Sequence, residues 1–350
     1  NATREPGTNT WNRRIRNADA DLADGDTRTY GVVLHVNRVV SLYYNNADNF
    51  LPSSTRSDLI DNNLLGHRTG VGQDVGVKLN LFDDRVRANL GWYETNDTNR
   101  EQGIDNAWTN NINAIWRTLG DDTRVLGGNA DTQDLAGKGY EFEITANLTK
   151  GWRTTFNWSI TEQFVSTMQP RRQAYIAANR ATWEANASLV LDATGAGVPT
   201  VDTVTGGPAT VATALRTADA IIAGILAGEG QVRRGLREHA GNLFTNYSFQ
   251  GGALKGFSVG LGANYRGKGV VGYDPTNGNA HIYGNDYLLV NGMVNYQKTL
   301  RSGRTWRVQL NVDNLLGEDD LIVTDADQVR PYRFVYQNPR RWSITNTLTF

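Results

Sequence analysis

The stretch Tyr140-Glu-Phe-Glu-Ile-Thr-Ala-Asn-Leu148, followed by Thr-Lys-Gly151 and Trp152-Arg-Thr-Thr-Phe-Asn-Trp-Ser-Ile160, decides the fold. On each side of the turn, apolar residues alternate with polar or charged ones. Successive side chains of a β-strand point to opposite faces. This period of two therefore predicts two antiparallel strands, joined by a tight turn, with one apolar and one polar face.

The same alternation recurs along the chain. Clear copies lie at 73–81, 86–93, 257–265 and 306–313, and weaker ones at 30–36, 40–44, 243–249, 288–296 and 342–350. We count about eleven strands of about 8 to 11 residues each. Short turns, near 37–38, 83–84, 149–151, 250–256 and 301–304, alternate with long connections, at 46–70, 96–136, 168–237, 267–286 and 315–340. Short turns at one end and long loops at the other are typical of outer-membrane barrels.

Charged residues within these strands avoid the apolar face. The residues expected to face lipid are Val77, Leu79, Leu90, Phe142, Ile144, Phe156, Leu261 and Leu310, and those expected to face a wet lumen are Lys78, Asn89, Glu143, Asn157 and Asn311. An arginine or lysine facing lipid at mid-depth costs about 2–4 kcal/mol. Aromatic residues gather at the strand ends, which predicts two interfacial girdles.

Composition narrows the functional classes. The 350 residues carry 35 Lys and Arg against 36 Asp and Glu, so no overall field attracts nucleic acid. The chain has no Cys, which excludes thiol catalysis and zinc-thiolate sites. Its four histidines are scattered without metal-ligand spacing. We therefore expect no catalytic residues, no metal site and no cofactor.

Three segments carry a family resemblance. Trp306-Arg-Val-Gln-Leu-Asn-Val-Asp-Asn-Leu-Leu-Gly317 and Pro339-Arg-Arg-Trp-Ser-Ile-Thr-Asn-Thr-Leu-Thr-Phe350 resemble the last two strands of TonB-dependent outer-membrane receptors. Asp134-Leu-Ala-Gly-Lys-Gly-Tyr-Glu-Phe-Glu-Ile144 resembles an internal strand of the same family. The resemblance covers most of the chain from about Asp26 onward.

The resemblance, together with the pattern, implies an all-β fold: a transmembrane, antiparallel, up-and-down β-barrel with long extracellular loops that contain some helix. Plugged transporters of this type have about 22 strands. Residues 1–350 are thus expected to be the C-terminal part of such a barrel, with the plug domain and the N-terminal strands outside this chain. We also expect residues 168–237 to form the largest external element.

The function implied by the resemblance is active uptake of a scarce nutrient across the bacterial outer membrane, with siderophore-iron, cobalamin or an oligosaccharide as the ligand. The implied partners are outer-membrane lipid and lipopolysaccharide, TonB through the plug, and the assembly machinery. A passive outer-membrane porin is the alternative, and a secreted soluble β-protein is a third. An upstream plug domain would separate the transporter from the porin.

Two sets of candidate site residues follow. External-loop residues expected to contact the ligand are Trp183, Tyr175, Arg266 and Tyr273. Leu348 and the terminal Phe350 resemble the signal read by the outer-membrane assembly machinery. Helix-like apolar spacing occurs at 171–191 and 209–226 within the longest loop, which predicts ordered helices that either act as a lid or simply pack on each other.

Overall fold

The computed structural model describes residues 2–4, 11–13, 25–52, 56, 58–60, 64–128, 130–301, 303–326 and 330–350. Its largest part is one antiparallel sheet of 11 strands whose spatial order follows the chain. The strands are β3 (Thr29–His35), β4 (Val40–Leu51), β5 (Arg68–Leu81), β6 (Val86–Gly103), β7 (Ala130–Thr149), β8 (Trp152–Ser166), β9 (His239–Ser248), β10 (Phe257–Arg266), β13 (Tyr287–Thr299), β14 (Thr305–Asp313) and β17 (Arg341–Thr349). The predicted up-and-down order is confirmed.

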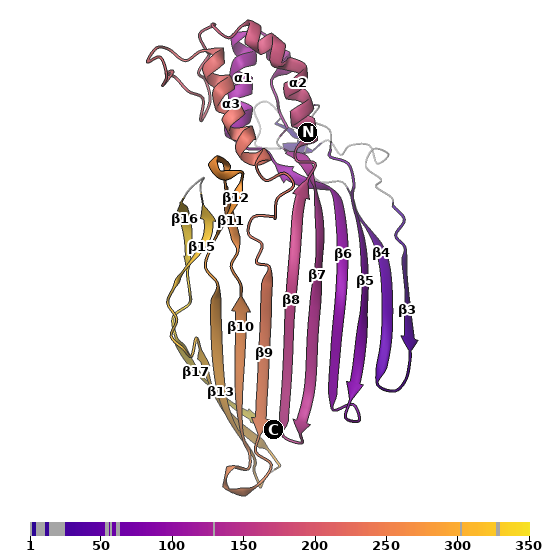
Figure 1. Ribbon diagram of the computed structural model, residues 1–350. Helices are drawn as coiled ribbons and strands as arrows, with labels where there is room; N and C mark the ends of the chain where they lie inside the picture. Colours follow the sequence, from indigo (N-terminus) through magenta and orange to yellow (C-terminus); the bar gives the residue numbers. More distant parts are fainter. Residues whose placement is uncertain are drawn as a thin grey trace.

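The connections also follow the predicted alternation. Figure 1 shows the short turns at one end of the sheet, together with the C-terminus, and the long loops at the other. The long loops carry three helices, α1 (Asn106–Thr118), α2 (Pro170–Ala185) and α3 (Val211–Leu226), and two small hairpins, β11 (Val270–Asp274) with β12 (Ala280–Tyr283), and β15 (Leu321–Ala326) with β16 (Pro331–Tyr336). Single-turn 3-10 helices lie at Asp122–Arg124, Gly252–Leu254 and Pro275–Asn277, and β1 (Ala2–Arg4) pairs with β2 (Trp11–Arg13).

The loop 168–237 is the largest of these elements and holds α2 and α3, as the sequence predicts. Two features differ from the expectation. Helix α1 lies in the 96–136 connection, where no helix was predicted, and β6 and β7 run on to Gly103 and back from Ala130. Strands β6 and β7 therefore extend well beyond their own last aromatic residues, Tyr93 and Tyr140. Among the described helices, none combines the length and the apolar character that crossing a membrane requires.

Strand register puts the predicted faces on opposite sides of the sheet. Leu90 pairs with Val77 on β5 and with Phe142 on β7. One residue along, Asn89 pairs with Lys78 and Glu143, and Glu143 pairs with Asn157. Directly paired residues share a face. The apolar and polar sets therefore form two separate rows across the sheet, which confirms the predicted parity.

Aromatic side chains form two rows on the apolar face. Near the short turns, Trp152 contacts Tyr247 with ring centroids 6.4 Å apart, and Phe257 contacts Tyr296 at 4.6 Å. Six residues farther along β8, about 20 Å at 3.3 Å per residue, Trp158 stacks on Tyr265 at 5.4 Å. This spacing matches the girdles that flank the apolar band of an outer-membrane barrel.

The polar face contains tyrosines that lie flat over glycines. The Tyr43 side chain lies over Gly76 on β5 and reaches Gly91 on β6, where an added Cβ would come within 2.6 Å of its hydroxyl oxygen. Lys78 places its ammonium 4.8 Å from the centre of the same ring. Glycine at these two positions leaves the room that the aromatic ring occupies.

Replacing Gly76 by Ala is expected to lower the free energy of unfolding by about 1–3 kcal/mol, because the new methyl would meet the backbone oxygen of Leu90 at 2.4 Å and the Tyr43 hydroxyl at 2.5 Å. Urea unfolding of the full-length protein in lipid vesicles, followed by gel mobility, measures this loss. Gly72→Ala on the same strand is the matched control, since its methyl would make an ordinary 3.5 Å contact with Thr95. Equal stability of the two variants would contradict the close packing of Tyr43.

Candidate functional site

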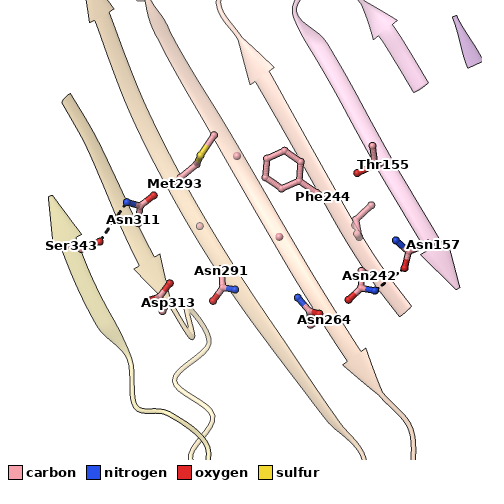
Figure 2. Close-up of a pocket in the computed structure, with 14 residues that line it drawn as sticks. Thr155, Asn157, Asn242, Phe244, Asn264, Asn291, Met293, Asn311, Asp313 and Ser343 are labelled. Atoms are coloured by element: carbon pink, nitrogen blue, oxygen red, sulfur yellow. Dashed lines mark hydrogen bonds between the residues drawn. The ribbon is translucent and has the colours of Figure 1, made fainter. Parts of the chain in front are cut away.

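The polar face of the sheet encloses a hollow of about 560 Å³. Figure 2 shows amide side chains from successive strands projecting into the same space. The labelled side chains are Thr155, Asn157, Asn242, Phe244, Asn264, Asn291, Met293, Asn311, Asp313 and Ser343. Because these positions share one parity, the strand pattern that keeps charge off the apolar face also builds this wet wall.

Hydrogen bonds link the wall side chains both between neighbouring strands and along one strand. The Asn242 amide donates to Asn157 at 2.7 Å, and the Gln309 amide donates to Asn311 at 2.6 Å. Arg307 Nε donates to Asn295 Oδ1 at 2.7 Å. An amide both donates and accepts. The amide side chains can thus bind water or a polar ligand, because they offer both hydrogen-bond donors and acceptors.

Several arginines lie on the polar side of the sheet near the ends of the strands that lead into the long loops, a region we call the mouth. Arg68 is paired with Asp97, whereas Arg100 has no ion-pair partner among the described residues. Arg233 donates to the Gln163 side chain at 3.1 Å. Burial, and then the charges of Arg233 and Arg68, lower the pKa of Arg100. We call Arg68, Arg100, Arg233, Arg234 and Arg237 the mouth arginines.

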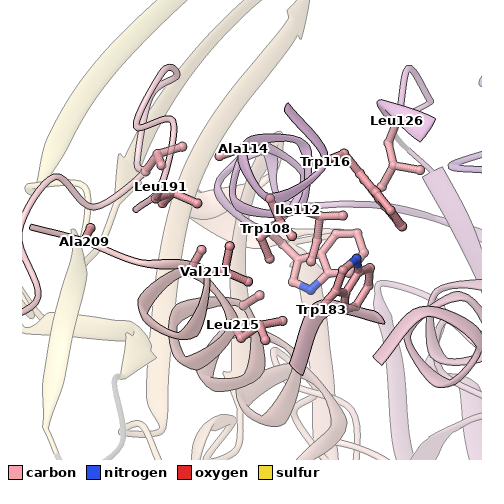
Figure 3. Close-up of a cluster of buried hydrophobic side chains, with 14 of the residues drawn as sticks. Trp108, Ile112, Ala114, Trp116, Leu126, Trp183, Leu191, Ala209, Val211 and Leu215 are labelled. Atoms are coloured by element: carbon pink, nitrogen blue, oxygen red, sulfur yellow. The ribbon is translucent and has the colours of Figure 1, made fainter. Parts of the chain in front are cut away.

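The three helices form a small domain beyond the mouth, which we call the helical cap. Figure 3 shows its core, where Trp183 of α2 packs against α1 and α3. The Trp183 ring lies edge-on to Trp116 with centroids 5.9 Å apart, and its side chain is 0% exposed. The Trp116 indole N–H donates to the Tyr175 hydroxyl at 2.7 Å. These contacts bury aromatic area at the centre of the cap.

A buried charge lies where α2 begins. The backbone N–H of Arg172 donates to Asp131 at 2.8 Å, and its guanidinium lies 4.8 Å from the Trp108 ring. Burial lowers the pKa of Arg172 to about 10 and raises the pKa of Asp131. Since Asp131 lies at the start of β7, these contacts fix the helical cap to the sheet.

The four predicted ligand residues are placed in different surroundings. Trp183 is fully buried, so no face of its ring is open to a ligand in this arrangement, and Tyr175 is half-buried beside it. Arg266 lies at the end of β10 and donates to Asn242 of the wall at 3.4 Å. Tyr273 of β11 donates its hydroxyl to the Val232 carbonyl, and burial raises its pKa. Their ligand roles stay predictions.

The two assembly-signal residues lie at the short-turn end. Leu348 pairs with Trp306 of β14, and its side chain is exposed. Phe350 is exposed, and the Arg304 guanidinium lies 4.6 Å from its ring. Both are therefore open to another chain along the edge strand β17, and their reading by the assembly machinery stays a prediction.

The sequence reasoning missed Arg100 and Arg233, two of the mouth arginines for which the described residues provide no ion pair. Within the described part of the chain, no group of three or more His, Asp or Glu side chains is arranged to hold a metal ion. Amides and arginines on one side of the sheet, with an ordered cap above them, offer hydrogen bonds and positive charge to a polar or anionic ligand.

The chain resembles known receptors over different lengths. No family model matches it. It is 25% identical over 151 residues to the ferripyoverdine receptor of Pseudomonas aeruginosa, which is 41% of this chain and 17% of the receptor. The crystal structure of the outer-membrane ferripyoverdine receptor of P. aeruginosa bound to ferripyoverdine matches 92% of this chain at a TM-score of 0.55 and 19% identity. The ferric-catecholate import receptor Fiu of Escherichia coli K12 matches 92% of it at 0.53 and 16%.

These matches cover only part of the relatives. The aligned region is 32% of the ferripyoverdine receptor structure and 34% of the Fiu structure, so this chain spans about a third of their length.

Proposed function

We propose that this chain, which has the fold of the C-terminal barrel of TonB-dependent outer-membrane receptors, is the wall of a transporter that takes up ferric siderophores. The fold belongs to the outer-membrane β-barrel class, as the sequence predicts. The observation that supports the proposal most is an open sheet with one polar face, the mouth arginines and the helical cap on the long-loop side. The same chain aligns over 92% of its length with the structure of a ferripyoverdine receptor. The relatives are transport receptors, and we propose a non-enzymatic role here as well.

We also propose that further strands complete the barrel. Strands β3 and β17 stand at the edges of the sheet, and both run from the long-loop end toward the short turns. Direct closure would pair them in parallel. An unpaired edge in hydrocarbon leaves backbone groups without hydrogen bonds at several kcal/mol each. Additional antiparallel strands satisfy both edges, and a plug carried with them would supply the contact with TonB.

Other partners belong to the same proposal. The aromatic rows and the apolar face would contact membrane lipid, with lipopolysaccharide around the outer row. The β17 edge, ending at Leu348 and Phe350, would be the segment recognised during assembly. Siderophore-iron is the ligand favoured by the relatives, in preference to cobalamin or an oligosaccharide.

The function is tested with the complete gene in a host that lacks its own siderophore receptors. We expect radiolabelled iron to enter when it is chelated by a siderophore, and uptake to stop when TonB is deleted. A passive porin is the contrasting case, because diffusion needs no motor. Iron uptake that continues without TonB would contradict the proposal and favour the porin.

A further inference from the structure

A second pocket lies under the helical cap, between the wall and the end of α3. Its volume is about 280 Å³. One side is apolar, from Val165, Met168 and Ile225, and the other is polar and basic, from Arg233, Arg234 and Tyr273. A volume of this size holds one planar group or a small anion and not a whole chelate.

A β-bulge places Arg100 on the face of the sheet that borders this pocket. Between Asp97 and Arg100 the β6–β7 register gains one residue, at Asn99, which has a φ of 57°. An extra residue in one strand reverses the faces of the residues that follow it. Arg100 pairs with Gln133, which lines the pocket, whereas an unbroken strand would point Arg100 to the outside.

The charges around the pocket do not balance. Arg234 is matched by Asp325, to which it is ion-paired, and Arg68 is matched by Asp97. Arg100 and Arg233 have no ion-pair partner among the described residues. Glu229, at the edge, accepts from the Met168 backbone N–H at 3.0 Å. Arg233, which lines the pocket, and Arg100, on the same face of the sheet beside it, thus bring two positive charges against the carboxylate of Glu229.

An unused acceptor lies in the same place. The Gln102 side-chain oxygen is buried without a hydrogen-bond partner, and Gln102 lines the pocket. Buried polar atoms are almost always paired in folded proteins. A ligand group carrying a hydrogen-bond donor, such as an amide N–H, beside its anionic oxygens would satisfy Gln102 and the arginines together.

We infer that this pocket binds an oxyanionic group with an apolar flank, of the catecholate or aryl carboxylate class, as one arm of the transported chelate. The inference rests on the proposed function and narrows it to anionic ferric chelates. Arginine binds paired oxygens through two parallel hydrogen bonds. Val165, Met168 and Ile225 contact the hydrocarbon face of the same arm.

Binding to the purified full-length receptor tests this assignment, with tryptophan fluorescence as the readout. The probes are a trianionic ferric tris-catecholate and a neutral ferric tris-hydroxamate. We expect Arg100→Gln with Arg233→Gln to weaken binding of the trianion by about tenfold to a hundredfold, because charge-assisted hydrogen bonds are lost. Binding of the neutral chelate should change by less than about twofold. Arg87→Gln is the matched control, since Arg87 lies at the short-turn end of β6 and is exposed.

Two results would overturn the inference: an unchanged affinity of the double variant for the trianion, or an equal loss for the neutral chelate. Heat-modifiable gel mobility checks that each variant folds. If the wild-type receptor binds no ferric chelate of either charge, the proposed function fails. The pocket is then tested with 2,3-dihydroxybenzoate alone by saturation-transfer NMR, where a signal that Arg233→Gln leaves unchanged would refute it.

Discussion

Replacing Trp183 by Ala is expected to unfold the helical cap and leave the eleven-stranded sheet intact. Trp183 is fully buried and touches Trp116 and Tyr175 at 5.9 Å between ring centroids. Truncating a buried tryptophan costs about 3–5 kcal/mol. The cap has its own small core, built from α1, α2 and α3. We expect this loss of free energy to unfold the small cap, whereas the sheet keeps its own hydrogen bonds and stays folded.

Hydrogen exchange measured by mass spectrometry on the full-length protein separates the two regions. Amides of α2 and α3 should exchange much faster in Trp183→Ala, and those of β5 to β8 should keep their protection. Tyr175→Phe is the milder comparison, because it removes only the hydroxyl that accepts from Trp116 and costs about 1 kcal/mol. If Trp183→Ala leaves the cap protected but abolishes ligand binding, Trp183 acts on the ligand and the structural reading is wrong.

The bilayer explains why the strands of the sheet and their two faces could be predicted from the sequence. Each strand has one face in hydrocarbon, so charge is excluded at every second position and the period of two persists along the chain. Lys78, Glu143 and Asn157 are assigned to one face on this basis alone, and the register places them in one row. The strict alternation of turn lengths then fixes which loops lie outside.

The loops are less predictable because tertiary packing outweighs local preference there. Helix α1 has the sequence Asn-Ala-Trp-Thr-Asn-Asn-Ile-Asn-Ala-Ile-Trp-Arg-Thr, and asparagine is a poor helix former. Its signal was the spacing of Trp108, Ile112, Ile115 and Trp116, which lie on one face and are buried. Asp105 caps the first turn by accepting from the Ala107 N–H at 2.6 Å. Packing of that face against α3 and α2 stabilises the helix.

Prediction of the candidate site from the sequence was limited for a different reason. Trp183 and Tyr175 were selected as aromatic loop residues, yet aromatic residues at helical spacing also form cores, and residue type does not separate the two roles. Arg100 was missed because residues 96–136 were predicted to be a long connection, whereas β6 continues to Gly103, and a regular continuation of the strand would place Arg100 on the outside. Only the bulge at Asn99, visible as a register shift between Asp97 and Arg100, turns it inward. The closeness of Arg100 to Arg233 depends on this register shift.

Phe156→Arg is expected to destabilise the barrel by about 2–4 kcal/mol, and Asn157→Arg, one residue along, by less than about 0.5 kcal/mol. Phe156 lies on the apolar face of β8, between Trp152 and Trp158 of the two aromatic rows. A guanidinium there enters the hydrocarbon near mid-depth. Asn157 lines the wet hollow and pairs with Glu143, so an arginine in its place stays hydrated beside a carboxylate.

Both variants add one positive charge to the same strand, which makes each the control for the other. Reversible urea unfolding of the full-length protein in vesicles measures the difference in stability. Assembly in cells, measured as heat-modifiable protein in the outer membrane, should fall for Phe156→Arg alone. Equal losses would mean that β8 has no lipid face at this depth. A larger loss for Asn157→Arg would reverse the assignment of the two faces, and with it the placement of the wet wall and the mouth arginines on the inside, because all of these follow from one shared parity.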